Sequence, residues 1–439
     1  MNLRLENPVT PRRRIVPHPK PPESLVDTGL DPEFLTDLLV KTVYRLNIER
    51  PSEMSRAIKL PVPLVEQLIQ KAHDKKLLEM KGQLGANLVA EMRYALTTRG
   101  REWALEALAQ SEWIGPVPVP VEQFVRQAKH QSIRTEILSR PMLEKQFADL
   151  TLADSLMDQI GPAVNSGQSM LLYGPPGNGK SSLAEAICAA YEDHLFVPYA
   201  IEVDKQVISM YDPTVHRYIG ESEADTQSLR HEIDFDARYV KCERPIVMTG
   251  GELTLDQLDL SYNPVSRVYE APMQLKAAGG VLVIDDFGRQ RQAPQDLINR
   301  LIIPLEKNVD FLSLQTGRKF EVPFDALMVF STNINPRDLV DDAALRRLRY
   351  KILVDSPDME TYVEIFIRAG RRFGLDVTED ILSFVLFDLY ENEPGAEFHA
   401  FHPRFLIEQT LAICAYEGVE PQLTSDYLRR AWRNLFTEH

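Results

Sequence analysis

The apolar positions of the first hundred or so residues follow helical and then strand-like spacing. Between Asp31 and Lys76, apolar side chains recur at helical spacing in three successive runs, which predicts three short helices. Residues 77–80 and 94–96 are short apolar stretches on either side of a glycine-containing segment, and they predict the two strands of a hairpin. A last helical pattern begins at about Thr98. The pattern therefore predicts three helices, a hairpin and a closing helix.

This order of elements is that of a winged helix, a small α+β domain that binds DNA or protein, and we place it at residues 26–115. The outer positions of its third helix have mixed charge, namely Glu66, Gln67, Gln70, Lys71 and Asp74. The segment 82–91, which corresponds to the wing, contains no Lys or Arg. Because binding to a phosphate backbone relies on positive charge, the sequence favours docking of a protein, and DNA binding stays the alternative.

Beyond residue 120, short apolar runs alternate with helical stretches. Residues 170–173, 281–284 and 327–330 are apolar runs of strand length, and each is followed by glycine or polar residues. Each of these runs predicts a strand. From Met359 to the end the pattern is helical again. We therefore expect strands and helices in this part of the chain, followed by a group of helices.

The first of these strands leads into a glycine-rich loop with the strongest chemical signal in the chain. The pattern G-x-x-x-x-G-K-[ST] is matched by Gly174, Pro175, Pro176, Gly177, Asn178, Gly179, Lys180 and Ser181, and Ser182 follows it. Between a strand and a helix, the backbone N–H groups of such a loop surround the β-phosphate of a nucleotide, and the helix N-terminus favours its charge. We expect Lys180 to reach the β- and γ-phosphates and Ser181 to bind Mg²⁺. The sequence thus predicts a site for ATP and Mg²⁺.

Two further strands end in side chains that suit the same chemistry. The run 281–284 is followed by Asp285, which is expected to hold Mg²⁺, and by Asp286, which is expected to activate the attacking water. The run 327–330 leads to Asn333, whose amide is expected to orient that water. The three side chains predict hydrolysis of the bound nucleotide.

Composition restricts the class of protein. The chain has 439 residues, of which 44% are hydrophobic and 26% charged, as in soluble proteins of two or three domains. It has no run of 18 apolar residues and no apolar segment at its start, so we expect a cytoplasmic protein without membrane insertion. The three cysteines are too widely spaced for a disulfide framework or a zinc site. A net charge of −15 argues against a protein that coats nucleic acid.

From about Met142 to the C-terminus, these motifs resemble those of the AAA+ ATPases. The phosphate loop, the Asp285-Asp286 strand and Asn333, which resembles sensor 1, occur in the order of that superfamily. Segment 340–347 resembles the region that projects into the ATP site of a neighbouring subunit. The resemblance therefore implies a homo-oligomeric ring, with six subunits expected, and arginine fingers at Arg346 and Arg347, with Arg349 as a third candidate.

The resemblance extends to a C-terminal lid and also includes two departures. Arg404 resembles sensor 2, which the lid brings to the γ-phosphate. Asp286 stands where the superfamily has glutamate and is one methylene shorter, so slow hydrolysis or none stays an alternative. Lys180 and Asp285 lie farther apart in the chain than the ATPase core requires, which predicts an insertion at about 205–275.

Within this interval, segment 217–223 resembles the first pore loop of ring-forming AAA+ ATPases. The resemblance implies that Tyr218, Ile219 and Gly220 grip a polypeptide in the ring channel, after a strand predicted at 200–203; an ordinary surface loop is the alternative. Residues 238–251 alternate in character and end in Gly-Gly, which predicts a β-hairpin. Its basic residues are expected to face a neighbouring subunit, a substrate or solvent; they are Arg238, Lys241 and Arg244.

The expected fold is a doubly wound parallel α/β sheet with a C-terminal helical lid, preceded by the winged-helix domain. The expected division is a disordered arm at 1–25, the winged helix at 26–115, a linker and helix at 116–141, the ATPase domain at 142–355 and the lid at 356–439. The expected function is Mg-ATP hydrolysis by a ring that remodels or threads a protein client, which docks on the winged helix directly or through an adaptor. The alternatives are an ATPase that reads DNA through the winged helix and a scaffold that binds ATP, assembles and hydrolyses slowly.

Overall fold

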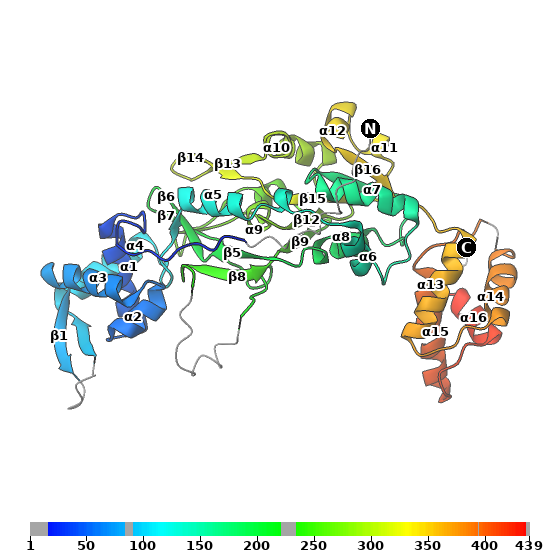
Figure 1. Cartoon of the computed structure of the whole chain (residues 1–439), viewed down its shortest axis with the longest axis horizontal. Coiled ribbons are helices and arrows are strands. Elements are labelled where there is room, and N and C mark those ends of the chain that lie inside the picture. Colours follow the sequence, from blue (N-terminus) through cyan, green and yellow to red (C-terminus); the bar gives the residue numbers. More distant parts are fainter. Residues whose placement is uncertain (1–15, 84–90, 221–233, 394, 436–439) are drawn as a thin grey trace, which may run out of the picture.

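The computed structural model describes residues 16–83, 91–220, 234–393 and 395–435. Figure 1 shows three bodies side by side along the long axis: the N-terminal helices at one end, a central body of sheets and helices, and the C-terminal helices at the other end. Three sequence predictions fall partly outside the described residues, namely the start of the arm, most of the wing and the acidic end of segment 217–223.

The N-terminal body consists of three helices, a hairpin and a fourth helix, in the predicted order. Its elements are α1 (Pro32–Leu46), α2 (Pro51–Ile58), α3 (Val62–Asp74), β1 (Leu78–Gln83), β2 (Met92–Leu96) and α4 (Thr98–Gln110). Asp31 begins α1, since its carboxylate accepts a hydrogen bond from the Glu33 N–H. Buried side chains from all four helices and β1, such as Leu39 and Leu68, form one core. The assignment of this body as a winged helix stays a prediction.

The central sheet has five strands in the order β16-β4-β15-β12-β9, and every neighbouring pair is parallel. The strands are β4 (Met170–Tyr173), β9 (Ile246–Thr249), β12 (Val281–Ile284), β15 (Leu327–Thr332) and β16 (Tyr350–Leu353). The three strands expected from the apolar runs are therefore present and adjacent to one another.

Helices cover both faces of this sheet. Because successive side chains of a strand point to opposite faces, Leu172 and Val283 pack on one side and Leu282 and Phe330 on the other. The helices on the first face are α6 (Arg140–Gln146), α7 (Asp154–Asn165) and α8 (Lys180–Ala189), and those on the second are α10 (Pro294–Lys307), α11 (Pro336–Leu339) and α12 (Asp342–Arg347). The predicted doubly wound α/β fold is confirmed.

Two smaller sheets lie beside the central one. A five-stranded sheet in the order β10-β11-β7-β6-β3 is built from β3 (Val119–Pro120), β6 (Ala200–Val203), β7 (Gln206–Ser209), β10 (Ser261–Asn263) and β11 (Val268–Glu270). A two-stranded sheet pairs β5 (His194–Pro198) with β8 (Tyr239–Glu243). Two short helices complete the interval, η3 (Leu255–Leu258) and α9 (Met273–Lys276). Apart from β3, these elements lie between α8 and β12, where the sequence predicts an insertion.

Strand pairing confirms one prediction in this interval and corrects another. The strand predicted at 200–203 is present as β6 of the second sheet, and the edge strand of the central sheet is β9. The predicted hairpin at 238–251 is wrong, because β8 pairs with β5 and β9 pairs with β12. This error arises because an alternating pattern identifies a strand but does not identify its partner.

A hairpin that the sequence pattern did not predict lies between α10 and β15. Its strands are β13 (Val309–Ser313) and β14 (Lys319–Pro323), which pair antiparallel. Leu312 and Val322 pack with Ile208 of β7 and Phe124 of α5 (Val121–His130), and a short turn, η1 (Ile133–Thr135), follows α5. The hairpin thus joins the second sheet to the central body.

The arm and the linker are more ordered than expected. Val16 is 3% exposed and packs against Val119, Phe196 and Tyr239, so the predicted disordered arm at 1–25 is wrong for its described part. The spacer before residue 121 is not free either, because β3 pairs with β6. In both cases valines next to prolines supply apolar surface that the neighbouring strands bury.

Two of the basic residues in segment 238–251 are buried, contrary to expectation. Arg238 is 2% exposed; it pairs with Asp236 at 2.7 Å and donates to the Thr28 carbonyl and the Gln123 side chain. Arg244 is 6% exposed and pairs with Asp193. A buried guanidinium needs several acceptors, and each arginine finds them on segments far apart in the chain. These two side chains hold segments of this chain together, and the expectation that they face a partner is wrong.

The C-terminal body is helical, as predicted. It contains α13 (Met359–Arg372), α14 (Glu379–Ser383), a π-helical continuation η4 (Phe384–Tyr390), α15 (His402–Glu417) and α16 (Ser425–Trp432). Its core is separate from that of the sheet and includes Tyr362, Phe366, Leu406 and Trp432. Among the helices that the structure describes, none combines the length and apolar character needed to cross a membrane.

Candidate nucleotide site

The phosphate loop lies where β4 ends and α8 begins. Gly174 and Gly177 have φ angles of +139° and +78°, and Gly179 has +82°, a region that favours glycine. A Cβ atom at Gly174 would meet the Val354 carbonyl, so only glycine fits there. Pro175, Pro176 and Asn178 complete the loop, and Ser182 lies in the first turn of α8. The loop is therefore an open cradle of backbone at a helix N-terminus, as the motif predicts.

Lys180 and Ser181 open α8 and face the acidic strand. The Lys180 ammonium is buried and donates to the Gly174 and Pro175 carbonyls at 3.0 and 2.8 Å, which holds it inside the curve of the loop. Burial lowers the pKa of Lys180, while the charges of Asp285 and Asp286 act against this. The Ser181 hydroxyl donates to Asp285 Oδ2 at 2.7 Å. The structure thus brings together the two residues predicted to hold Mg²⁺.

Asp286 and Asn333 follow neighbouring strands at the same edge of the sheet. Asp286 is exposed and has a φ of +47°, an unusual conformation for a residue other than glycine. The Asn333 Oδ1 atom is buried and has no hydrogen-bond partner among the described residues. Since β15 lies between β4 and β12, Asn333 emerges between the phosphate loop and the two aspartates. An amide oxygen without a partner in this position suits a water molecule or a phosphate-bound group.

These side chains fit a nucleotide with Mg²⁺. Hydroxyl and carboxylate oxygens are the protein ligands that Mg²⁺ prefers, and Ser181 and Asp285 present one of each in contact. Ser181 and Asp285 would hold Mg²⁺ there, and the ion would offset the negative charge of the bound phosphates. The loop N–H groups and Lys180 would bind the same phosphates from the other side.

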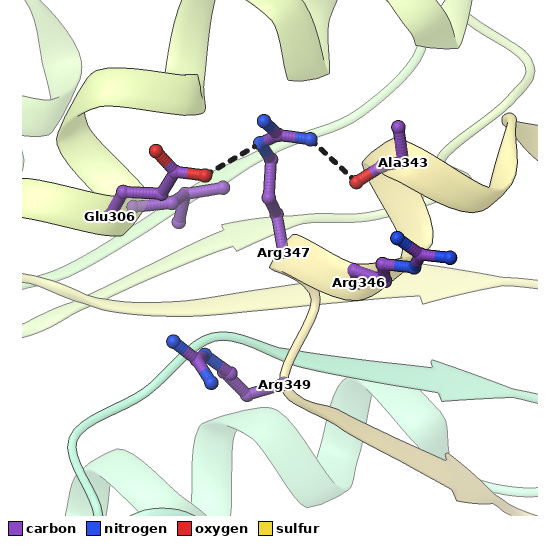
Figure 2. Close-up of a pocket in the computed structure, with 6 residues that line it drawn as sticks. Glu306, Ala343, Arg346, Arg347 and Arg349 are labelled. Atoms are coloured by element: carbon purple, nitrogen blue, oxygen red, sulfur yellow. Dashed lines mark hydrogen bonds and ion pairs between the residues drawn. The ribbon is translucent and has the colours of Figure 1, made fainter.

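The predicted finger arginines lie around a cavity of about 420 Å³ (Figure 2). Arg347 points to α10, where its guanidinium pairs with Glu306 at 3.0 Å, and it also donates to the Ala343 carbonyl. Arg346 and Arg349 point in other directions in Figure 2, and both are exposed. Neither makes a hydrogen bond or ion pair with any residue that the structure describes. Arg347 is thus engaged within its own chain, whereas Arg346 and Arg349 have no polar partner among the described residues.

The arginines and the phosphate loop lie at opposite ends of the central strands. Arg349 immediately precedes β16, which runs parallel to β4 with Tyr350 beside Met170. The phosphate loop leaves β4 after Tyr173, about 10 Å farther along the strand at about 3.3 Å per residue. The arrangement therefore does not bring Arg346 or Arg349 to the phosphate loop of the same chain.

Arg404 lies in the first turn of α15, on the C-terminal body. It is exposed and pairs with Glu408 at 2.7 Å, one turn along the helix. The residues just before α15 touch the phosphate loop: the Ala400 N–H donates to Asn178 Oδ1 at 3.0 Å, and Phe401 packs on Gly177. The helix that carries Arg404 thus begins beside the loop. Ala400 and Phe401 were not predicted from the sequence, because no local pattern marks a contact between segments that lie 222 residues apart.

Tyr218, Ile219 and Gly220 lie away from this site. The Ile219 N–H donates to the Lys241 carbonyl, and Tyr218 forms a bridge with Cys242, so this segment is attached to β8. The strand predicted before it, at 200–203, is present and belongs to the second sheet, and the role of the segment as a pore loop stays a prediction. Tyr218 is 52% exposed. The segment is therefore an exposed loop attached to the two-stranded sheet of β5 and β8.

Two family models match the chain. Residues 151–310 match the AAA ATPase domain, and residues 358–434 match a domain of unknown function, DUF8689, which covers the C-terminal helices. No curated protein matches the chain.

Several solved structures are similar over much of the chain. NtrX from Brucella abortus in complex with ADP is 16% identical with a TM-score of 0.38, and the match covers 74% of this chain and 64% of that one. NtrX in complex with ATP is 15% identical with a TM-score of 0.35, over 77% of this chain and 67% of that one. A point mutant of Thermotoga maritima RuvB is 12% identical with a TM-score of 0.35, over 69% of this chain and 73% of that one. These scores are too low for the likeness to support an argument, and the chain spans about two thirds of the NtrX chains.

The assignment therefore rests on the domain model and on the site. The match at 151–310 contains the phosphate loop and the Asp285-Asp286 strand, and the parallel sheet places Asn333 between them. Residues 151–310 of this chain therefore form an AAA ATPase domain.

Proposed function

We propose that this chain hydrolyses Mg-ATP within a homo-oligomeric ring, with six subunits expected, and couples turnover to remodelling of a protein client. The observation that carries the proposal is the placement of Arg346 and Arg349. They are exposed, free of partners among the described residues and at the opposite end of the strands from the phosphate loop. Arginines in this position suit the ATP of a neighbouring subunit, because they lie too far along the sheet for their own.

Each side chain of the site has a role in the proposed hydrolysis. The loop N–H groups and Lys180 bind the phosphates, and Ser181 and Asp285 hold Mg²⁺. Asp286 accepts the proton of the attacking water, which Asn333 orients. The positions of the side chains at one edge of the sheet support these roles.

Two arginines complete the site in this proposal. A neighbour's Arg346 stabilises the charge that develops on the transferred phosphoryl group, and an arginine in this role is worth about 10³ to 10⁵ in rate. Arg404 approaches from the lid when its pairing with Glu408 opens.

Mixing of two defective variants tests the ring directly. Arg346→Ala lacks the finger but keeps its own phosphate loop, and Lys180→Ala lacks the loop lysine but keeps its finger. Each variant alone is expected to turn over ATP at least about 10³-fold more slowly than the wild type. Mixed in equal amounts they form interfaces in which one subunit supplies the loop and the other the finger. Recovery of turnover in the mixture is the expected result; no recovery, with wild-type assembly of both variants, would contradict action in trans.

A slow scaffold is a second candidate, favoured by Asp286. The Asp286 side chain is shorter than the glutamate of the superfamily. Asp286 also has a φ of +47° and is exposed, so its neighbours do not confine the carboxylate to one direction. In this case the protein binds ATP and assembles but turns over at the rate of Lys180→Ala. If the wild-type rate of ATP turnover is low and Asp286→Glu raises it, the result supports the scaffold. If the wild type and Asp286→Glu have equal rates, and both exceed the rate of Lys180→Ala, the result supports the enzyme.

The N-terminal body is the proposed client or adaptor site. The α3 residues predicted to face outward are exposed and carry both charges, and Gln70 donates to Asp74 along the helix. A face of this kind gives little attraction to a phosphate backbone, so the DNA-reading alternative gains no support from it. A salt-dependent shift of the full chain on duplex DNA at low salt is the result that would favour that alternative instead.

A further inference from the structure

The side chain of Asn178 connects the phosphate loop to the lid. This residue occupies a position that the motif G-x-x-x-x-G-K-[ST] leaves free, since the phosphates are bound by backbone N–H groups. Its side chain is nevertheless buried, with 9% of the residue exposed. The Oδ1 atom accepts a hydrogen bond from the Ala400 N–H at 3.0 Å, and Nδ2 donates to Ser356 Oγ at 3.4 Å. The amide therefore has a partner at each of its two ends, and both lie outside the loop.

The two partners of Asn178 lie at the start of the C-terminal helical body and just before its helix α15. Ser356 is in the segment that leaves β16 and enters α13, where the sheet body passes into the C-terminal helices. Ala400 is two residues before α15, the helix that carries Arg404. Asn178 thus contacts both the entrance of the lid and the turn that sets the start of the Arg404 helix.

An apolar contact reinforces these hydrogen bonds. Phe401 packs so closely on Gly177 that a Cβ atom there would clash with its ring. Gly177 also has a positive φ, which glycine adopts readily, so both the backbone conformation and the close contact with Phe401 require glycine at this position. A shift of residues 177 and 178 must therefore shift the turn at 400–401 or break its contacts.

We propose that Asn178 is a positioning residue that transmits nucleotide occupancy of the phosphate loop to the lid. The inference rests on the proposed nucleotide function of the loop. When phosphates bind, the backbone N–H groups at 177–179 turn toward them, and the Asn178 side chain moves with its backbone. The turn at 400–401 then follows, and α15 changes the position of Arg404 relative to the γ-phosphate.

The test uses Asn178→Leu, which keeps the size of the side chain and removes both hydrogen bonds. The matched control is Asn392→Leu on the exposed surface of the lid, where the amide donates to the Asp388 carbonyl and has no other side-chain hydrogen bond among the described residues. The first readout is hydrogen exchange at the Ala400 amide in the full chain without nucleotide. Loss of one hydrogen bond predicts exchange about threefold to tenfold faster in Asn178→Leu and unchanged in the control. Unchanged exchange at Ala400 in Asn178→Leu overturns the contact.

The second readout is the response of the lid to ADP. In the wild type and in Asn392→Leu, ADP is expected to change the exchange of residues 396–404. In Asn178→Leu, ADP is expected to bind with its affinity lowered about threefold to tenfold, and at saturation this response is lost. An equal lid response in Asn178→Leu overturns the inference while the nucleotide function stands. Absence of ADP binding in the wild type overturns the proposed function and the inference together.

Discussion

Removal of the Arg238 guanidinium is the sharpest test of how the chain is held together. This side chain lies at the meeting point of three segments: it pairs with Asp236 beside β8, donates to the Thr28 carbonyl before α1, and donates to Gln123 on α5. It is 2% exposed, so water cannot replace the lost contacts. Arg238→Ala leaves the Asp236 carboxylate buried without its partner.

The size of the effect follows from this burial. Breaking a buried ion pair by removing one partner costs about 3 to 5 kcal/mol. For a cooperative unit of about 150 to 250 residues, each kcal/mol lowers the melting temperature by about 2 to 4 °C. Arg238→Ala should therefore lower the melting temperature of the central body by about 6 to 20 °C. The double variant Arg238→Met with Asp236→Leu should recover most of this loss, because it removes both charges and keeps the volume.

Thermal unfolding followed by circular dichroism or calorimetry measures the shift. The control is Arg430→Ala, which breaks an exposed pair with Glu417 whose two side chains are 40% and 34% exposed. Such a pair contributes at most about 1 kcal/mol, so the control should shift the melting temperature by no more than about 4 °C. A shift for Arg238→Ala no larger than that of the control would refute the reasoning.

Three further predictions concern the site and the lid. Glu306→Gln should lower ATP turnover with little loss of stability, because it releases Arg347 from a half-exposed ion pair and so disturbs the segment that carries the predicted finger arginines. Measuring turnover and melting temperature on the same variant checks this prediction. A wild-type rate of turnover would contradict it. Burial lowers the pKa of His402 from 6.5 to about 4, so the folded lid binds fewer protons than the unfolded lid between these values. Lid stability should therefore be complete above pH 6.5 and fall as the pH decreases toward 4, and His402→Gln should flatten this dependence in unfolding measured against pH. Gly177→Ala should abolish ADP binding, measured by calorimetry, because φ at this position is +78° and the new Cβ atom would meet the Phe401 ring. Adding Phe401→Ala should restore only that part of the ADP affinity that the clash with the ring removes.

The local parts of the site were predictable from the sequence. The phosphate loop, the two aspartates and Asn333 were found because each follows an apolar run of strand length, and carboxyl ends of parallel strands meet at one edge of a sheet. The N-terminal order of helices and hairpin followed from spacing alone, since amphipathic periodicity reports which face of an element is buried. These predictions needed only neighbouring residues.

The errors concerned contacts between segments that lie far apart in the chain. The alternating pattern at 238–251 predicted a hairpin, but β8 pairs with β5 and β9 pairs with β12. Arg238 was expected at a surface, because nothing nearby in the sequence announces that Thr28 and Gln123 will surround it. The burial of a charged side chain is decided by the acceptors that the fold delivers to it.

The sequence by its own local pattern determined that this protein carries a phosphate loop between a strand and a helix, because the loop needs only its own backbone, its glycines and those two adjacent elements. The tertiary structure alone decided which strand flanks the Asp285-Asp286 strand at the edge of the sheet, which finger arginine is engaged within its own chain, and that Asn178 meets the lid. Those features depend on contacts between distant segments, and such contacts form only where the whole chain can bury its apolar surface and satisfy its polar groups together.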